Sequence, residues 1–592
     1  MYSASSLDQM PHMLTSYLMY GHSMNFTIPD IDRTDYMLML GANPAASNGS
    51  LMTAGDILGR LDRIKTRGGK LVLIDPRRTE SARYASEHHF IKPGSDALFL
   101  LGLIQVIFAK GLVQVQSRLP LNGKIEDIQN LVSSIPLTTI AELTHIPVTE
   151  IERIAVEFAS ADKSVCYGRM GIAAQEFGAL NHWLIQLLNI ITGNLDRAGG
   201  MMFTTPAIDM TDIAGRGSFA SFHSRVRKLP EFNRELPSAT LADEMLTPGE
   251  GQVKAFVVTA GNPVISTPNG ARLEQALANL EFMVAIDFYM NETTKYADII
   301  LPPCGPFEHA LYDLVFTNLA VRNVTRYSEP LFKKKSFMRS DAQIYIALTH
   351  RMEELKARKQ TTITKLKMKP MHQIKSLMTI ERVIDLGLRH GRYGGGFKSF
   401  ITGEGLTLEK LKKYKHGMDL GPLEPRIPNK LFTKDKKIQL FPKQFLDDLG
   451  RLHDYVKRHE HLQKLTLIGR RDLRTNNSWM HNSQRLVKGK NRCDLFIHPQ
   501  TAHDYRITQG EQVYIRSEVG ALKVTVAITE DIMPNVVSLP HGWGHHRKGM
   551  QLSVASSNPG ISVNDITDHQ FIDALSGNAA LNGIPVELQK IF

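Results

Sequence analysis

Two stretches of this sequence join an apolar run to a glycine turn that suits the binding of an anion. Residues 36–40 are followed by Gly41-Ala-Asn-Pro44, and residues 253–260 are followed by Gly261-Asn-Pro263. A short apolar run that stops at Gly or Pro is typical of a buried strand in a parallel sheet. Backbone N–H groups after such a strand, together with the start of the next helix, bind phosphate groups. We therefore expect two similar cradles for one kind of anionic ligand.

Acidic residues end two further apolar runs. Asp75 ends the run 70–74 and is followed by Arg77, and Asp287 ends the run 282–286. An acid in this place accepts ribose hydroxyls in dinucleotide-binding folds, and an arginine binds phosphate through two parallel hydrogen bonds. Taken alone, the same residues are equally typical of a surface turn. The Gly-x-Gly-x-x-Gly fingerprint follows none of these runs, so we do not expect a plain nicotinamide dehydrogenase.

Other glycine turns carry polar neighbours. Gly168-Arg-Met-Gly171 precedes Gln175, and Gly94 leads into Ser95 and Asp96, which are good N-cap residues for the apolar helix expected after them. Each turn alone indicates little, but all lie at the ends of successive elements. In the last 150 residues or so, hydrogen-bond donors and a stacking surface follow short β-type runs. These residues are Arg471, Trp479, His541 and Asn564.

The elements that must position these residues alternate between strands and helices up to about residue 300, which predicts parallel sheets wound by right-handed crossovers. The expected fold is α/β, with two doubly wound parallel-sheet blocks and a C-terminal β-barrel domain built from short strands. The run 14–24 predicts a short helix near the start. The expected domains are residues 1–204, residues 205–445 with a basic polar insertion, and residues 446–592.

Composition narrows the function classes. Of 592 residues, 42% are hydrophobic and 22% charged, which is ordinary for a globular protein. The formal charge of +11 lies largely in basic runs such as 333–335, 356–369 and 434–437. We interpret these as solvated surface, with attraction of an anionic cofactor, partner or nucleic acid as the alternative. No aromatic-interleaved nucleic-acid motif, membrane-length apolar run or signal peptide is visible, so we expect no nucleic acid, no membrane span and a cytoplasmic location.

The ordered motifs resemble those of the molybdopterin oxidoreductases, in particular the formate-dehydrogenase-like branch of the dimethyl sulfoxide reductase family. The motifs that carry the resemblance are Leu40-Gly-Ala-Asn-Pro44, Ile74-Asp-Pro-Arg-Arg-Thr79, Lys92-Pro-Gly-Ser-Asp-Ala97, Thr192-Gly-Asn194, Gly261-Asn-Pro263, Tyr296-Ala-Asp-Ile-Ile-Leu-Pro302, Arg506-Ile-Thr-Gln-Gly-Glu511, Pro540-His-Gly-Trp543, Val563-Asn-Asp565 and Leu575-Ser-Gly-Asn578. The last four resemble that family's molybdopterin-dinucleotide-binding domain. The resemblance runs over nearly the whole chain.

The resemblance implies an enzyme with two molybdopterin guanine dinucleotides holding one molybdenum or tungsten ion, which carries out redox chemistry on a small substrate. At the first dinucleotide it implies Gly41, Asn43, Pro44, Asp75, Arg77, Gly94, Asp96, Gly168, Gly171 and Gln175. At the second it implies Gly261, Asn262 and Asp287. The C-terminal domain would close over the pterins with Arg471, Trp479, His541 and Asn564.

The sequence departs from the family pattern at its start. Members usually begin with a cysteine-rich iron–sulfur segment and the first part of the second α/β domain, and this sequence starts downstream of both. No cysteine precedes Cys166, so a thiolate ligand to the metal is not expected. Ser3 and Ser6 are our metal candidates, with Ser5 and Asp8 left open, and helix capping is the plain alternative.

We further expect that this chain alone binds no iron–sulfur cluster, and that an electron-transfer partner or a missing N-terminal piece supplies one. The alternative function is that of an inactive or partner-dependent cofactor-binding remnant of such an enzyme. The sequence does not indicate the substrate.

Overall fold

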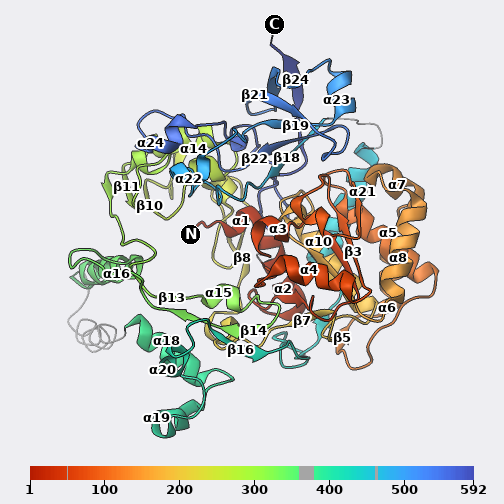
Figure 1. Ribbon diagram of the computed structural model, residues 1–592, viewed down its shortest axis with the longest axis horizontal. Helices are drawn as coiled ribbons and strands as arrows, with labels where there is room; N and C mark the ends of the chain where they lie inside the picture. Colours follow the sequence, from red (N-terminus) through yellow and green to blue (C-terminus); the bar gives the residue numbers. More distant parts are fainter. Residues whose placement is uncertain (50, 359–378, 460–464, 592) are drawn as a thin grey trace.

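The computed structural model describes residues 1–49, 51–358, 379–459 and 465–591. Three lobes surround the N-terminal helix α1 (Ser5–Asp8), which lies near the middle of the molecule (Figure 1). The first α/β block lies to one side of it, the second block to the other, and the C-terminal domain above both. Most of the basic run 356–369 falls outside the described residues.

The first block is built on a four-stranded parallel sheet in the order β4-β3-β2-β6. Its strands are β2 (Tyr36–Leu40), β3 (Lys70–Ile74), β4 (Glu87–His89) and β6 (Ser164–Gly168). The chain adds β3 and β4 on one side of β2 and then returns to add β6 on the other side. This sheet is therefore doubly wound, and its switch point lies between β2 and β6.

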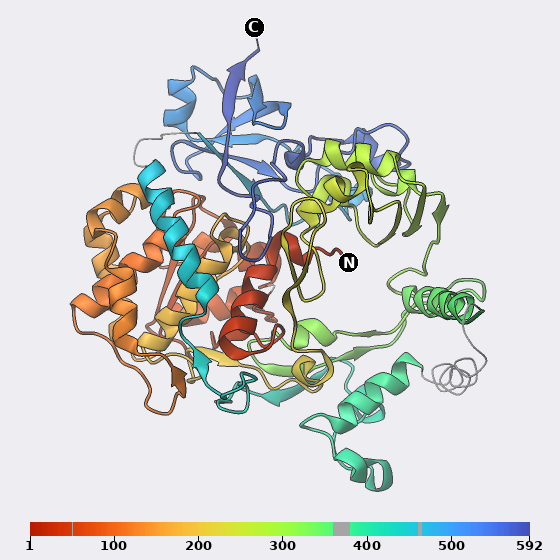
Figure 2. The ribbon, with the colours of Figure 1, turned by 180° about the vertical axis from the view of Figure 1, so that it is seen from behind.

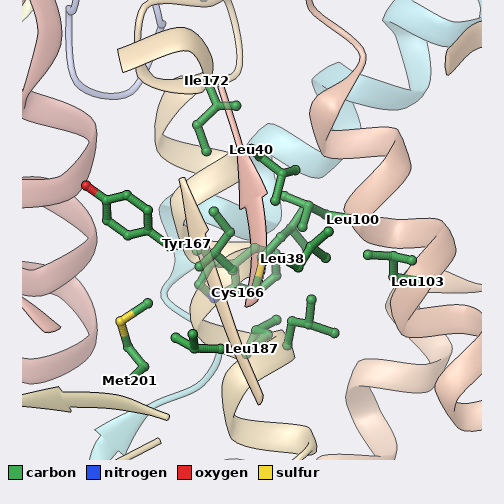
Figure 3. Close-up of a cluster of buried hydrophobic side chains, with 14 of the residues drawn as sticks. Leu38, Leu40, Leu100, Leu103, Cys166, Tyr167, Ile172, Leu187 and Met201 are labelled. Carbon is green, nitrogen blue, oxygen red and sulfur yellow. The ribbon is translucent and has the colours of Figure 1, made fainter. Parts of the chain in front are cut away.

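Helices cover both faces of this sheet, as the apolar cores of β2, β3 and β6 require. The main ones are α4 (Ile57–Thr66), α5 (Asp96–Ala109), α8 (Val148–Ser160) and α10 (Gly178–Ile191). Every residue of β2 and β6 is buried. Leu38 and Cys166 of the strands meet Leu100 of α5 and Leu187 of α10 in one core (Figure 3).

The helix expected over 14–24 lies four residues earlier, as α2 (Met10–Tyr20). Pro11 occupies its first turn, where the missing N–H costs nothing. Gly21 ends it with a left-handed φ of 83°, and its N–H donates to the carbonyl of Tyr17. The apolar residues after Gly21 therefore belong to the next segment, which leads into β1 (Thr27–Pro29).

The second block holds a three-stranded parallel sheet in the order β10-β11-β12. Its elements are α12 (Leu241–Leu246), β10 (Ala255–Thr259), α13 (Pro263–Ser266), α14 (Gly270–Ala278), β11 (Phe282–Ile286) and β12 (Ile299–Ile300). The three helices pack with Val258, Met283 and Ala285 in one core. Beyond β12 the chain runs through α16 (Asp341–Arg358) and α18 (Ile380–His390), which lie at the periphery (Figures 1 and 2).

The C-terminal domain is a mixed seven-stranded sheet in the order β23-β18-β22-β19-β21-β20-β24, curled as a half-barrel. Its strands are β18 (Thr466–Arg470), β19 (Leu495–Ile497), β20 (Gln512–Arg516), β21 (Ala521–Ile528), β22 (Val536–Pro540), β23 (Ile584–Pro585) and β24 (Glu587–Lys590). The expected fold class is thus confirmed.

Before this sheet, α21 (Lys443–His459) crosses back to the first block, where Phe445 stacks on Trp183 of α10 with ring centroids 5.3 Å apart. In the part of the chain that the structure describes, no helix is long and apolar enough to cross a membrane.

Candidate functional site

The carboxyl ends of β2 and β6 meet at the switch point of the sheet, which is its topological crevice. Gly41 has a φ of 52°, and its carbonyl accepts the N–H of Gly171 at 2.8 Å. A Cβ on Gly41 would lie 2.8 Å from the backbone N of Ile172 and 2.9 Å from the backbone of Gly171. The two predicted glycine turns therefore touch at the switch point of the sheet, the position where α/β folds bind ligands.

Polar groups of the next turns line this crevice. Asn43 accepts hydrogen bonds from the hydroxyl and N–H of Ser81, at 2.7 and 3.2 Å, and donates to Glu80 at 2.7 Å. The Asp75 carboxylate accepts the N–H of Arg77 at 2.9 Å, and the Arg77 guanidinium lies 3.3 Å from Glu80. Asn43, Asp75 and Arg77 thus belong to one cluster, as the strand order predicts.

Two buried carboxyl groups in this cluster have unusual acidities. Burial raises the pKa of Asp75 to about 7, although Arg77 opposes the shift. Burial likewise raises the pKa of Asp96 to about 6, against a hydrogen bond of 2.8 Å that Gln175 donates. Gln175 also donates to the carbonyl of Gly171 at 2.7 Å, which ties Asp96 to the glycine turn after β6. Perturbed acids in a crevice are typical of functional sites.

The C-terminal domain closes one side of the first crevice. The N–H of Arg78 donates to the carbonyl of Asp531 at 2.7 Å, and the N–H of Met533 donates to the carbonyl of Pro76 at 3.1 Å. The turn that follows β3 is therefore fixed against the C-terminal sheet. Gly94, which has a φ of 89°, precedes α5 on the same block.

The second glycine turn is held by a buried polar chain. Asn262 donates to Glu292 at 2.6 Å and accepts the hydroxyl of Thr293 at 2.8 Å. The other oxygen of Glu292 lies 2.8 Å from Nδ1 of His545, and both side chains are fully buried. Burial is the largest single influence on Glu292 and acts to raise its pKa, but the contacts with His545 and the hydrogen bond from Asn262 together outweigh it, and the pKa lies below its ordinary value. Asn564 donates to the last turn of α13 at 2.9 Å, which joins the C-terminal domain to this cradle.

Two arginines and a histidine lie at the glycine turn that follows β6. Arg169, inside the glycine turn after β6, forms an ion pair of 3.2 Å with Asp8. Arg471 reaches the sulfur of Met170 at 2.9 Å, and burial lowers the pKa of its guanidinium. Burial, reinforced by Arg471, lowers the pKa of His541 to about 3, so this histidine is neutral at pH 7. An excess of buried positive charge over acidic partners suits an anionic ligand.

Buried polar atoms without a hydrogen-bond partner gather beside the second cradle. His481 lies between Trp543 and His545, with ring centroids 4.5 Å from each. Buried polar groups normally have partners, so this set of atoms offers hydrogen bonds to a polar ligand. Among the described residues, these atoms are both ring nitrogens of His481, Nε2 of His545, Nε1 of Trp543, Nε of Arg547 and Oγ of Ser562. The donor set fits a large polar cofactor that spans the seam between the lobes.

Other predicted residues lie apart from these clusters or have other contacts. The Trp479 side chain is 61% exposed. Asp287, at the end of β11, accepts the N–H of Tyr289 at 3.0 Å. Ser6 donates to Ser238 at 2.8 Å, and Ser3 donates to Glu235. Across the described residues, no three side chains of His, Cys, Asp or Glu are placed to hold a metal ion.

The site residues that were not predicted from the sequence include Arg169, Glu292 and His545. Arg169 lies inside a glycine turn that had been singled out, and an arginine in an anion-binding turn is itself a signal. Glu292 and His545 are 253 positions apart, so only the fold brings them together.

Comparisons with known proteins agree with this geometry. Residues 2–351 match the family model described as molybdopterin oxidoreductase, and residues 465–585 match the molydopterin dinucleotide binding domain. The chain is 25% identical to the assimilatory nitrate reductase catalytic subunit of Bacillus subtilis over 92% of this chain and 76% of that subunit. It is also 25% identical to formate dehydrogenase H of Escherichia coli, over 56% of this chain and 47% of that protein.

A solved structure shares the fold. Acetylene hydratase from Pelobacter acetylenicus superposes with a TM-score of 0.75 and 18% identity, covering 100% of this chain and 82% of that one. Likeness at this identity shows the fold and not the reaction. The chain spans about three quarters of the nitrate reductase subunit and less than half of several other relatives. The family match covers more than half of the chain, and the chain belongs to the molybdopterin oxidoreductases, in the dimethyl sulfoxide reductase family.

Proposed function

We propose that this chain binds two molybdopterin guanine dinucleotides around one molybdenum or tungsten ion and catalyses redox of a small substrate by oxo or hydride transfer at that ion. One observation carries the proposal. Asn43 and Asn262 have nearly the same backbone angles, φ and ψ of −129° and 70° against −122° and 67°. Each follows a parallel strand and precedes a Pro-started turn of helix, so the two lobes present equivalent cradles to a shared seam.

At the first cradle, we assign the guanosine ribose to Asp75 and a phosphate to Arg77, beside Gly41, Gly171 and the Asp96–Gln175 pair. An acidic residue at this position accepts ribose hydroxyls in dinucleotide-binding folds, and the guanidinium of Arg77 supplies donors for phosphate oxygens. Pro44, Gly94 and Gly168 shape the turns around it. These assignments rest on the hydrogen bonds that already connect the cluster.

At the second cradle, we assign the other nucleotide to Gly261, Asn262 and Asp287. Arg471 and His541 would contact the pterin and phosphate part in the seam, with Asn564 holding α13 and Trp479 offering a stacking surface. Arg169 is added to the first cradle because it lies in the turn after β6, and His545 is added to the second because it contacts Glu292. When bound, the cofactor supplies the redox and group-transfer chemistry. The role of these residues is to bind, orient and exclude water.

Ser3 and Ser6 remain our proposed metal ligands, with Asp8 as the alternative. In support, Asp8 and Arg169 form a charged pair at the same end of the first crevice. The Ser6 hydroxyl donates to Ser238, so ligation requires that this hydrogen bond be exchanged. We place the protein in the cytoplasm because Cys166, Cys304 and Cys493 are all free thiols. An iron–sulfur protein, or a further segment that binds a cluster, is the proposed electron partner.

The test is a stoichiometry measurement on the protein purified from molybdate-replete cells. We expect about two guanine nucleotides per metal ion. Asp75→Ala should lower the nucleotide content of the first cradle alone, and Asn262→Ala should lower that of the second cradle alone. Metal without nucleotide, or neither, would refute the proposal. The second candidate function is that of a partner-dependent remnant that binds the cofactor without turning it over. This function is favoured if the chain holds both metal and nucleotide but no added electron acceptor reoxidises the reduced cofactor.

The acidity of Asp75 gives this proposal a pH dependence. Burial raises its pKa to about 7, so the carboxylate that accepts ribose hydroxyls is lost as the pH falls through that value. We expect the affinity of the first cradle for GDP to fall about tenfold for each pH unit below 7. Titration calorimetry at pH 8, 7 and 6 measures it. Asp75→Asn should flatten the profile, whereas Asp62→Asn, whose side chain is 57% exposed on α4, should leave it unchanged.

A further inference from the structure

A separate cavity lies at the amino end of β6, away from the crevice. Its volume is about 440 Å³, and small-molecule sites in proteins measure about 300–1,000 Å³. Its wall is formed by residues 114–118 after α5, residues 192–198 after α10, and Pro425. Asn194 in this wall accepts the N–H of Ser164, the first residue of β6, at 3.2 Å. The glycine turn of the crevice follows the other end of the strand, about 13 Å away, so the cavity does not belong to the proposed cofactor site.

Hydrogen bonds and a close glycine contact fix the wall of this cavity. Gly193 has a φ of 71°, and a Cβ on it would lie 2.7 Å from the carbonyl oxygen of Gln114. The N–H of Gln114 donates to the carbonyl of Ile191 at 2.7 Å. The side-chain amide of Gln116 donates to the carbonyls of Gly193 and Leu195, both at 2.7 Å. The two segments are therefore held in one arrangement, and the cavity between them is preformed.

Two arginines line the cavity, Arg118 and Arg197, whose side chains are 41% and 40% exposed. The Arg118 guanidinium donates to Gln116 at 2.9 Å, to the carboxylate of Asp196 at 3.2 Å, and to the carbonyl of the same aspartate. Arg197 donates two hydrogen bonds to Asp162, of 2.8 and 2.7 Å. A guanidinium has five N–H donors. These bonds use three donors of Arg118 and two of Arg197, so two and three donors remain for a ligand.

The acidic residues beside these arginines leave the cavity suited to an anion. Asp196 is fully buried, and its carboxylate accepts the N–H groups of Arg426 at 2.9 Å and Ile427 at 2.8 Å in addition to Arg118. Its charge is therefore satisfied inside the wall. Asp162 is 69% exposed, so water screens its charge and its ion pair with Arg197 is weak. A carboxylate that enters the cavity can add to both guanidinium groups without displacing a buried partner.

We propose that this cavity binds a small aliphatic dicarboxylate, with one carboxylate on each arginine. The planar fork of a guanidinium matches a carboxylate through two parallel hydrogen bonds. Val115, Ala198 and Pro425 give the cavity an aliphatic lining, which suits the carbon chain between two carboxylates. Among the described residues that line it, none carries an aromatic ring on which a nucleobase could stack. The ligand is therefore a dicarboxylate and not a nucleotide, and this inference does not rest on the proposed function.

Titration calorimetry of the purified chain with succinate tests the proposal. We expect succinate to bind with a Kd of about 1 mM or less. Butyrate, which has the same number of carbon atoms but one carboxylate, should bind at least about tenfold more weakly. Arg197→Gln should weaken succinate binding at least about tenfold. The control is Arg63→Gln on α4, where the arginine is 51% exposed and pairs with Asp56 at 3.2 Å, and it should leave binding unchanged. Absence of saturable succinate binding, or equal binding of butyrate, would overturn the proposal.

Hydrogen exchange locates the bound succinate. We expect succinate to protect the amides of residues 114–118 and 192–198, and we expect Arg197→Gln to remove this protection. Arg118→Lys keeps the charge but loses the fork, so it should also weaken binding at least about tenfold. Circular dichroism and thermal unfolding show that both variants fold. Protection of the glycine turn 41–44 in place of these segments would put succinate in the crevice and overturn the proposal. Inorganic phosphate that binds as tightly as succinate, with the same protection, would also overturn it.

Discussion

Replacing Gly41 with alanine is expected to destabilise the first block by about 2–4 kcal/mol and to abolish nucleotide binding there. The new Cβ would lie 2.8–2.9 Å from backbone atoms of Gly171 and Ile172, and a backbone cannot rotate away as a side chain can. The positive φ of 52° adds a smaller strain, about 1–2 kcal/mol. This steric contact is relieved only if β2 and β6 separate at their carboxyl ends, and the first cradle is formed at these ends.

Hydrogen exchange of the amides of β2 and β6 is the appropriate measurement, because a chain of several lobes does not unfold in one step. Gly261→Ala is the matched control. Its Cβ would have no atom closer than 3.5 Å, so we expect a change below about 0.5 kcal/mol. If Gly41→Ala protects these amides as well as the native chain does, the close contact of the two turns is not a feature of the folded protein.

The strands of the first block were predictable from the sequence because their signal is local. β2, β3 and β6 are apolar runs closed by Gly or by Asp-Pro, and the order of elements implies that their ends meet. The cluster of Asn43, Asp75 and Arg77 follows from that rule alone. The bounds of α2 were harder to predict, because Pro11 in its first turn and the left-handed Gly21 after its last residue set them, and not the extent of the apolar run.

Contacts between lobes could not be predicted in this way. Glu292 and His545 belong to loops of different lobes, and neither residue type nor spacing indicates that they meet. The sequence of a strand also does not predict which elements pack on its two faces. The sequence of β10 is that of a strand buried on both faces, yet Val257 faces solvent, because periodicity describes the strand and not what packs on it.

The contact between Glu292 and His545 carries the largest expected loss of stability. Both side chains are fully buried and lie 2.8 Å apart, and Asn262 is the other partner of the carboxylate. His545→Ala leaves a buried carboxylate with one hydrogen bond, and removing one member of such a pair costs about 3–5 kcal/mol. The loss should appear as release of the C-terminal domain from the second block, measured by limited proteolysis and hydrogen exchange of α13.

The acidity of Glu292 gives the same contact a defined pH dependence. Because the folded-state pKa is lower than the ordinary value, its stabilisation is present above the unfolded pKa and is lost as the pH falls through the folded one. The effect of His545→Ala should therefore shrink in acid below about pH 4. Glu281→Ala is the control, since its ion pair with Lys254 is 2.7 Å long but largely exposed and worth about 0–1 kcal/mol.

A double-mutant cycle separates the pair from the cavities that the substitutions leave. We expect Glu292→Ala with His545→Ala to cost clearly less than the sum of the two single variants, since neither variant alone removes both unsatisfied groups. Additive losses would mean that the two side chains stabilise the seam independently, and that Asn262 is held by Thr293 rather than by a chain of polar contacts reaching into the C-terminal domain. In that case His545→Ala should leave the orientation of Asn262, and hence nucleotide binding at the second cradle, unchanged.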